Sequence, residues 1–223
     1  ARESVKQKAV SAIASRGNLS DSYTKLGYGS WQNLPGTITE LQELKKIIPD
    51  CDEYTGKNVD ESKIKALSAQ GKLKNYRVIH FATHGMVVPE VPELSALVLT
   101  QTNAGSADDN YLRADEISKL ELNADFVALS ACETGLGKIY NGDGVVGLTQ
   151  SFMIAGANSL AVSLWQVADQ STSQFMSGIY QLSASDHDYL NAIARMKQQF
   201  ISGAFGEKYK APYYWAPFIY YGR

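Results

Sequence analysis

The sequence predicts an α/β domain with a mostly parallel central sheet flanked by helices. Short apolar segments alternate along the chain with longer amphipathic ones, which is typical of strands that each lead into a helix. The apolar segments contain few polar residues, as expected for strands covered on both faces. The chain has 223 residues, which suits one domain, or one domain and a short arm, at roughly 100–200 residues per domain.

The first 33 residues are expected to lie outside this domain, which we predict to span residues 34–223. Residues 1–16 predict a polar helix without a strong apolar stripe, either an arm or the end of a repeat region. Residues 18–36 are rich in Gly, Ser, Asn and Tyr, a composition typical of a loop or linker.

The domain opens with two predicted helices joined through a short strand. Thr37 is the expected cap of the first helix, and Glu40 follows it at the spacing of a capping box. The apolar stripe of this helix comprises Ile38, Leu41, Leu44, Ile47 and Ile48. A strand is predicted at 52–55, and then a helix from Asp60 to about Leu73 with Ile64 and Leu67 inward.

The later elements follow from the same patterns. Apolar, β-rich runs predict strands at 76–82, 95–100 and 125–131, and a short helix is expected at about 113–120. Two further helices are predicted at 169–182 and from 189 to about 200. The chain ends in aromatic residues that suit an edge strand and the core: Tyr213, Tyr214, Trp215 and Phe218.

One uncharged stretch is long enough to cross a membrane. It runs for 25 residues from Gly144 to Ala168, against about 20 for a spanning helix. However, it contains several polar side chains and is interrupted at Gly156. A buried helix, a turn at Gly156 and a buried strand therefore fit better, and we expect no membrane partner.

Composition excludes several classes of protein. The 21 basic and 23 acidic residues give a net charge of −2, so bulk charge does not favour nucleic-acid binding. Cys51 and Cys132 are the only cysteines, too few for a disulfide framework or a cysteine-based metal site. We therefore expect a reducing compartment, the cytoplasm. The first residues are unlike a signal peptide, and the start at Ala1 indicates a piece of a longer protein.

Candidate chemistry lies where two predicted strands end, because sites in α/β sheets gather beyond the carboxyl ends of strands. The strand at 76–82 leads to His84 and Gly85, and the strand at 125–131 leads to Cys132. A neighbouring imidazole favours the reactive thiolate, so the two residues could act as nucleophile and base. The N–H groups of Gly85 and Cys132 could bind an oxyanion. The alternative is that Cys132 is simply a small buried apolar residue.

The other histidines and the glycine-rich segments do not predict a metal or phosphate site. His80 and His84 are four residues apart, about 13 Å along a strand, too far to share one metal ion. His80 is therefore expected to be a hydrogen-bonded core residue, and His187 to lie in a solvated loop. Neither a phosphate-binding GK[ST] loop nor a G-x-S-x-G serine motif is present. We expect no metal ion or organic cofactor.

Two residues near 165–169 are candidates for substrate binding. Asp169 follows a predicted buried strand and opens a predicted helix, so its simplest role is that of an N-cap. A carboxylate at this point could alternatively bind a basic side chain of a substrate. Trp165, at the same strand end, could form a wall of the pocket.

Several long segments, in order and at the expected spacing, resemble the CHAT domain family. They are VIHFATHG (78–85), SALVLT (95–100), LRADEISKLELNADFVALSACETGLG (112–137), GDGVVGLTQSFMIAGANSLAVSLWQVAD (142–169) and YYWAPFIYYG (213–222). LPGT at 34–37 resembles the usual entry of that domain. The resemblance covers about Leu34 to Arg223. It implies a caspase-like fold and a cysteine peptidase related to separases, often attached to tetratricopeptide repeats.

The resemblance also assigns roles to individual residues. The family histidine falls on His84 and the nucleophile on Cys132, with Gly85 and the Cys132 amide as oxyanion donors. Related separases have an aspartate near LWDVTD that lines the pocket for a basic residue before the cut. Here LWQVAD has Gln166 in place of the first acid, which leaves Asp169 as the candidate.

We therefore expect a cysteine endopeptidase that cleaves protein substrates through Cys132 and His84. Attached tetratricopeptide repeats and a regulatory protein are the expected partners, and the isolated domain is expected to be latent, with mobile loops at 86–94 and 101–111. One alternative is a non-catalytic CHAT module that serves as an interaction scaffold. Another is a cysteine amidase that acts on small substrates.

Overall fold

The computed structural model describes residues 23–24, 31–88, 94–101, 108–130, 143–165 and 167–222, with only the backbone described for residues 143–146 and 169. Its centre is a four-stranded sheet in the order β1-β5-β6-β7. The strands are β1 (Val78–Phe81), β5 (Phe126–Leu129), β6 (Ser159–Ser163) and β7 (Phe218–Gly222). Strands β1, β5 and β6 are parallel, and β7 is antiparallel to β6. The predicted α/β class with a mostly parallel sheet is confirmed.

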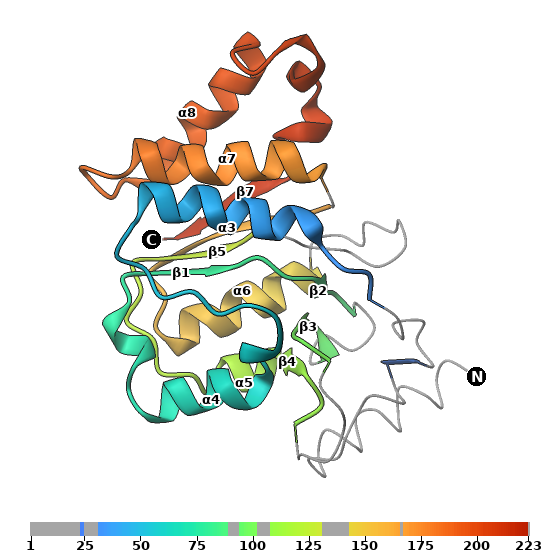
Figure 1. The fold of residues 1–223 in the computed structure, drawn as a ribbon, viewed down its shortest axis with the longest axis vertical. Coiled ribbons are helices and arrows are strands. Elements are labelled where there is room, and N and C mark those ends of the chain that lie inside the picture. Colours follow the sequence, from blue (N-terminus) through green and yellow to red (C-terminus); the bar gives the residue numbers. More distant parts are fainter. Residues whose placement is uncertain are drawn as a thin grey trace.

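Helices cover both faces of this sheet (Figure 1). On one face lie α3 (Pro35–Ile47) and α7 (Asp169–Leu182), with α8 (Tyr189–Ser202) outside α7. On the other lie α6 (Asp143–Ala155), α4 (Glu61–Ala69) and α5 (Ala114–Ile117). The chain also forms short 3-10 turns: η1 (Gly56–Asn58), η2 (Leu73–Asn75), η5 (Glu207–Lys210) and η6 (Pro212–Tyr214).

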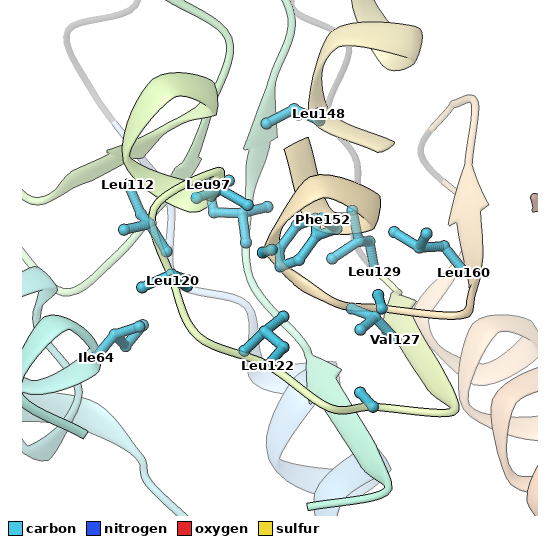
Figure 2. Packing of buried hydrophobic residues seen from close by; sticks show 14 of the residues in the cluster. Ile64, Leu97, Leu112, Leu120, Leu122, Val127, Leu129, Leu148, Phe152 and Leu160 are labelled. Atoms are coloured by element: carbon cyan, nitrogen blue, oxygen red, sulfur yellow. The ribbon is translucent and has the colours of Figure 1, made fainter. Parts of the chain in front are cut away.

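Each face of the sheet has its own hydrophobic core, and β5 contributes to both. Phe126 and Ala128 belong to the core beneath α3 and α7. Val127 and Leu129 alternate with them and belong to the core beneath α6, as the period of two in a strand requires. Figure 2 shows Phe152 of α6 beside Leu129 in this second core. The segment that leads to Cys132 is therefore held from both sides.

A second, antiparallel sheet lies beside the central one, in the order β2-β3-β4. Its strands are β2 (Gly85–Met86), β3 (Ala96–Val98) and β4 (Tyr111–Arg113). The strand predicted at 95–100 is present as β3, but it belongs to this small sheet. Strand β4 was not predicted, because its three residues show almost no periodicity, and of the helix expected at 113–120 only α5 forms.

The start of α3 differs from the prediction. Leu34 is the N-cap residue and no side chain caps the helix, while the Thr37 hydroxyl donates to the Leu34 carbonyl at 2.7 Å. Glu40 turns into the core, where it is 3% exposed, so the expected capping box is wrong. Ile38 is 59% exposed, and the apolar face is formed by Leu41, Leu44, Ile47 and Ile48 instead.

Of the other predicted elements, one strand is absent and three helices are present. Residues 52–55 form no strand. Helix α4 begins as expected, with Asp60 accepting a hydrogen bond from the Lys63 N–H at 2.8 Å, and Ile64 and Leu67 are buried. It ends at Ala69, before Gly71 in the left-handed region (φ 68°). Helices α7 and α8 confirm the predictions at 169–182 and 189–200.

The uncharged stretch forms α6, a turn at Gly156 and β6, as predicted. Among the described helices, none combines the length and the hydropathy that a membrane span requires. The helix predicted at 1–16, residues 89–93 and 102–107 of the two loops, and Cys132 lie outside the described residues.

Candidate active site

His84 lies between β1 and β2 and is 6% exposed. Its Nε2 atom is 2.6 Å from the carbonyl oxygen of Gln32. A carbonyl oxygen can only accept a hydrogen bond, so Nε2 carries a proton and donates it. This contact fixes both the tautomer and the orientation of the imidazole.

The Trp31 ring packs against the imidazole of His84. The two ring centroids are 5.1 Å apart with an interplanar angle of 40°. The Trp31 indole N–H donates to the Tyr111 hydroxyl of β4 at 3.0 Å. Burial raises the pKa of Tyr111 above its usual value, so the phenol stays neutral. Residues 31–32 were predicted to lie in a linker, and no sequence pattern indicated that they contact His84.

The small sheet holds the backbone around His84. The His84 carbonyl accepts a hydrogen bond from the Val98 N–H at 2.8 Å, and the Thr83 hydroxyl donates to the Val98 carbonyl. Gly85 pairs with Leu97 in the β2–β3 ladder and is buried. His84 and Gly85 are thus fixed by strand pairing, although the oxyanion role of Gly85 remains a prediction.

The strand that precedes Cys132 is the neighbour of the strand that precedes His84. Phe81 of β1 and Leu129 of β5 are register partners in a parallel pair, so both strands end at the same edge of the sheet. The N–H of Ser130 donates to the Phe81 carbonyl at 3.0 Å. The structure therefore brings the approach to Cys132 beside the approach to His84, while the contact between the two residues remains a prediction.

The candidate substrate-binding residues lie at the end of β6 and the start of α7. Trp165 is half-buried, and its indole N–H donates to the Tyr213 carbonyl at 3.1 Å. This contact joins Trp165 to the aromatic C-terminal segment. Asp169 is the first residue of α7 and the N-cap position falls on Ala168, one residue before the cap that the sequence suggested. A binding role for either residue remains a prediction.

A buried polar group near this edge was only partly anticipated. His80 contacts the Tyr180 hydroxyl through Nδ1 at 2.9 Å and a Glu40 carboxylate oxygen through Nε2 at 3.0 Å, which confirms the hydrogen-bonded core histidine. Glu40 was missed because its spacing from Thr37 suggested a cap. His187 is exposed, as predicted. The described residues contain no cluster of three or more His, Cys, Asp or Glu side chains that could hold a metal ion.

A mostly parallel sheet between two helical layers, with a buried histidine beyond its first strand, defines an α/β domain of the caspase-like type. The chain belongs to the CHAT domain family, whose model matches residues 1–223. This family is part of the caspase-like cysteine peptidase superfamily.

Two relatives are named as tetratricopeptide repeat proteins. The chain is 27% identical to tetratricopeptide repeat protein 28 of Homo sapiens over 149 residues, which cover 67% of this chain and 5% of that protein. It is 24% identical to tetratricopeptide repeat protein 28 of Mus musculus over 185 residues, which cover 67% of this chain and 7% of that protein. The chain thus spans a small fraction of the length of these relatives. Their names agree with an association between CHAT domains and tetratricopeptide repeats.

Proposed function

We propose that the chain is a cysteine endopeptidase that cleaves protein substrates through Cys132 and His84. The observation that supports this most directly is the position of His84, a buried imidazole beyond the end of β1 whose Nε2–H bonds the Gln32 carbonyl at 2.6 Å. The parallel pairing of β1 and β5 supports it further, because both candidates follow strands that end at one edge.

The reaction needs neither metal ion nor organic cofactor. The sulfur of Cys132 attacks the scissile carbonyl carbon as the thiol proton passes to His84, and the resulting oxyanion accepts hydrogen bonds from the N–H groups of Gly85 and Cys132. His84 protonates the leaving amine as the C–N bond breaks, which leaves a thioester. Water then attacks the thioester, and its proton returns through His84 as the thiol is regenerated. The second product is the free carboxylate.

The substrate is held, in this proposal, by the region around Trp165 and Asp169. If the Asp169 carboxylate lines the pocket for the residue before the cut, the enzyme prefers Arg or Lys at that position. An apolar residue there would leave a buried carboxylate unpaired, which costs a few kcal/mol. Residues 34–223 form the peptidase domain, and attached tetratricopeptide repeats or a regulatory protein control it. The exposed thiol of Cys51 suits a reducing compartment such as the cytoplasm.

A peptide-library cleavage profile of the full chain tests this proposal, with Cys132→Ala as the matched control. We expect cleavage by the wild-type chain and none by Cys132→Ala or His84→Ala at unchanged circular dichroism. Asp169→Ala should broaden the residue preference before the cut with little change in melting temperature. A lower melting temperature with unchanged preference would instead assign Asp169 to stabilising the start of α7.

A second candidate is a non-catalytic CHAT module that binds partner proteins. It is favoured by the burial of His84 and by the Trp31 ring that covers it. The two candidates differ in one measurement. A wild-type chain that cleaves no peptide, with or without its flanking repeats, and that reacts with no thiol-directed peptide probe at Cys132, would support the scaffold.

A further inference from the structure

Four side chains, three of them buried and the fourth, His80, partly buried, form a continuous chain of hydrogen bonds beside the candidate site. The Tyr180 hydroxyl of α7 lies 2.9 Å from His80 Nδ1, and His80 Nε2 lies 3.0 Å from Glu40 Oε1. The Ser130 hydroxyl, directly after β5, donates to Glu40 Oε2 at 3.2 Å. We call these four residues the Glu40 network. They come from α7, β1, α3 and the end of β5, so the network joins one helical layer to two neighbouring strands.

The donors of the network all point toward the Glu40 carboxylate. Burial and the nearby Glu40 charge hold the pKa of Tyr180 well above its usual value, so the phenol keeps its proton and donates to Nδ1. Nε2 then carries the proton of His80 and donates to Oε1, while Ser130 donates to Oε2. A single tautomer of His80 satisfies every member, and the arrangement has one consistent direction.

Core stability alone is a weak reason for such a network. Glu40 and Ser130 are each 3% exposed, and well-packed apolar residues commonly give a core equal or greater stability than a buried ionic group does. A satisfied polar network does confer a unique geometry, because each member accepts only one arrangement of its partners.

Ser130 is the member whose position matters for the candidate chemistry. Its hydroxyl is fixed by Glu40, and its N–H donates to the Phe81 carbonyl of β1 at 3.0 Å. Cys132 follows Ser130 by two residues, a span of at most about 7 Å, and His84 follows Phe81 by three. Ser130 thus joins the two strand ends that lead to the candidate nucleophile and the candidate acid.

We propose that Glu40 and Ser130 are positioning residues for the Cys132–His84 pair, with His80 and Tyr180 holding the Glu40 carboxylate in place. This inference rests on the proposed function. The network moves no proton during the reaction. It fixes the root of the segment that carries Cys132 against the strand that leads to His84, so the sulfur and the imidazole keep the distance that the reaction requires.

Two variants of the full chain test the inference against a matched control. Ser130→Ala deletes one hydroxyl, and Glu40→Gln removes the charge with little change of shape. Ser159→Ala is the control. Ser159 is a buried serine at the start of β6, at the edge of the sheet opposite to Ser130, and its hydroxyl donates to the Asp125 carbonyl at 2.7 Å. We expect both test variants to lower kcat about tenfold to a hundredfold, because small displacements of reacting groups have effects of that size. KM should change less than about threefold.

The control separates positioning from stability. Ser159→Ala should lower the melting temperature about as much as Ser130→Ala does and leave kcat unchanged. If Glu40→Gln does not fold, Ser130→Ala alone decides, since it retains the Glu40–His80 pair. Equal kcat in Ser130→Ala, Ser159→Ala and the wild-type chain would overturn the inference and leave the network with a stabilising role only.

A second readout does not depend on peptide cleavage. The rate of Cys132 alkylation is measured against that of the exposed Cys51 in the same molecule. Both test variants should slow Cys132 severalfold relative to Cys51, because the thiolate then loses its imidazole partner. A wild-type chain that cleaves no peptide, with or without its flanking repeats, contradicts the proposed function. An unchanged ratio of the two alkylation rates in Ser130→Ala and Glu40→Gln contradicts the positioning role instead.

Discussion

At the scale of single residues, His84 is held from several directions at once. The Gln32 carbonyl fixes Nε2, Trp31 packs on the ring, and β3 binds the backbone. An imidazole fixed in this way has one tautomer and one orientation. A defined orientation of this kind is what the acid role proposed for His84 requires.

The first prediction concerns the reactivity of the two thiols. In the wild-type chain, iodoacetamide should modify Cys132 faster than in the His84→Ala variant, because a neighbouring imidazole favours the thiolate. Cys51 should react at the same rate in both, as its side chain is exposed. Mass spectrometry after limited labelling measures both rates in one sample. Equal Cys132 labelling in the two proteins would rule out the pairing.

The second prediction concerns Glu61, whose carboxylate accepts N–H bonds from Asp109 and Asn110 at 3.0 and 2.9 Å. Burial raises the pKa of Glu61 to about 7, against 4.5 in an unfolded chain, while the Lys65 ammonium opposes the rise and Glu116 adds to it. Between these values the folded chain holds a proton that the unfolded chain has released. Its contribution to the free energy of unfolding therefore falls as the pH rises through that window.

Glu61→Gln removes this titration and so should flatten the pH dependence of stability. We expect the melting temperature of the wild-type chain to fall relative to that of Glu61→Gln between about pH 5 and about pH 8. Asp108 and Glu116 also contact Lys65, so Asp108→Asn serves as the control for loss of a neighbouring charge. Parallel curves for the wild type and Glu61→Gln would show that Glu61 is ionised throughout.

At the scale of elements, the turn between α6 and β6 depends on the absence of a side chain. Gly156 has φ 112°, and a Cβ built on it would lie 2.3 Å from the Leu122 carbonyl oxygen. That oxygen belongs to the backbone and cannot move aside without displacing the segment between α5 and β5. The close approach allows α6 to reverse directly into the buried strand β6.

The third prediction compares two glycines of the left-handed region. Gly71 has φ 68° and no atom near its built Cβ among the described residues, so Gly71→Ala should lower the free energy of unfolding by roughly 1–2 kcal/mol through backbone strain alone. Gly156→Ala should lower it by a further 1–3 kcal/mol, roughly, through the steric clash. Urea denaturation of both variants measures the difference. Equal losses of unfolding free energy in the two variants would mean that the Leu122 carbonyl shifts aside at little cost.

The sequence predicts elements well where one pattern dominates. Strands β1 and β5 follow from apolar β-rich runs, and α7 follows from its amphipathic period, because local preference and burial agree there. Strand β4 was missed because three residues give almost no periodicity. Glu40 was misplaced because a carboxylate near a helix start suits a cap, whereas its actual partners, His80 and Ser130, are 40 and 90 residues away.

The candidate site was predictable to a similar extent. The ends of the strands and the family resemblance identify His84 and Cys132. Nothing local indicates that Gln32 and Trp31 contact His84 across about 50 residues of sequence. Contacts of this kind come from tertiary packing of a segment whose own composition is typical of a loop.

At the scale of the whole molecule, the segment before α3 packs against the candidate site. Trp31 and Gln32 lie in this segment, and both contact His84. Tyr23 is also buried, and its hydroxyl donates to the Leu94 carbonyl at 3.1 Å. A displacement of this segment by attached repeats or a regulatory protein would change the surroundings of His84 directly, and only a difference in affinity between the two states can supply the energy.

The fourth prediction follows from this connection. A chain of residues 34–223 lacks Trp31 and the Gln32 carbonyl, so its peptidase activity should be at least about tenfold below that of the full chain. Gln32→Ala is the matched control and should retain activity, because the contact uses the main-chain oxygen. Activity assays at equal folded fraction, set by circular dichroism, compare the three proteins. Full activity of residues 34–223 would show that the segment is dispensable.

Strand β5 has no face toward solvent, since Phe126 and Ala128 enter one core while Val127 and Leu129 enter the other. Such a strand cannot relax sideways when a neighbour changes volume, because both interiors are close-packed. A methyl group gained or lost in either helical layer should therefore shift β5 as a unit, together with Ser130 at its end. Core sequences on opposite faces of the sheet would then have to change together, and variants of this domain would accumulate compensating pairs of substitutions across β5.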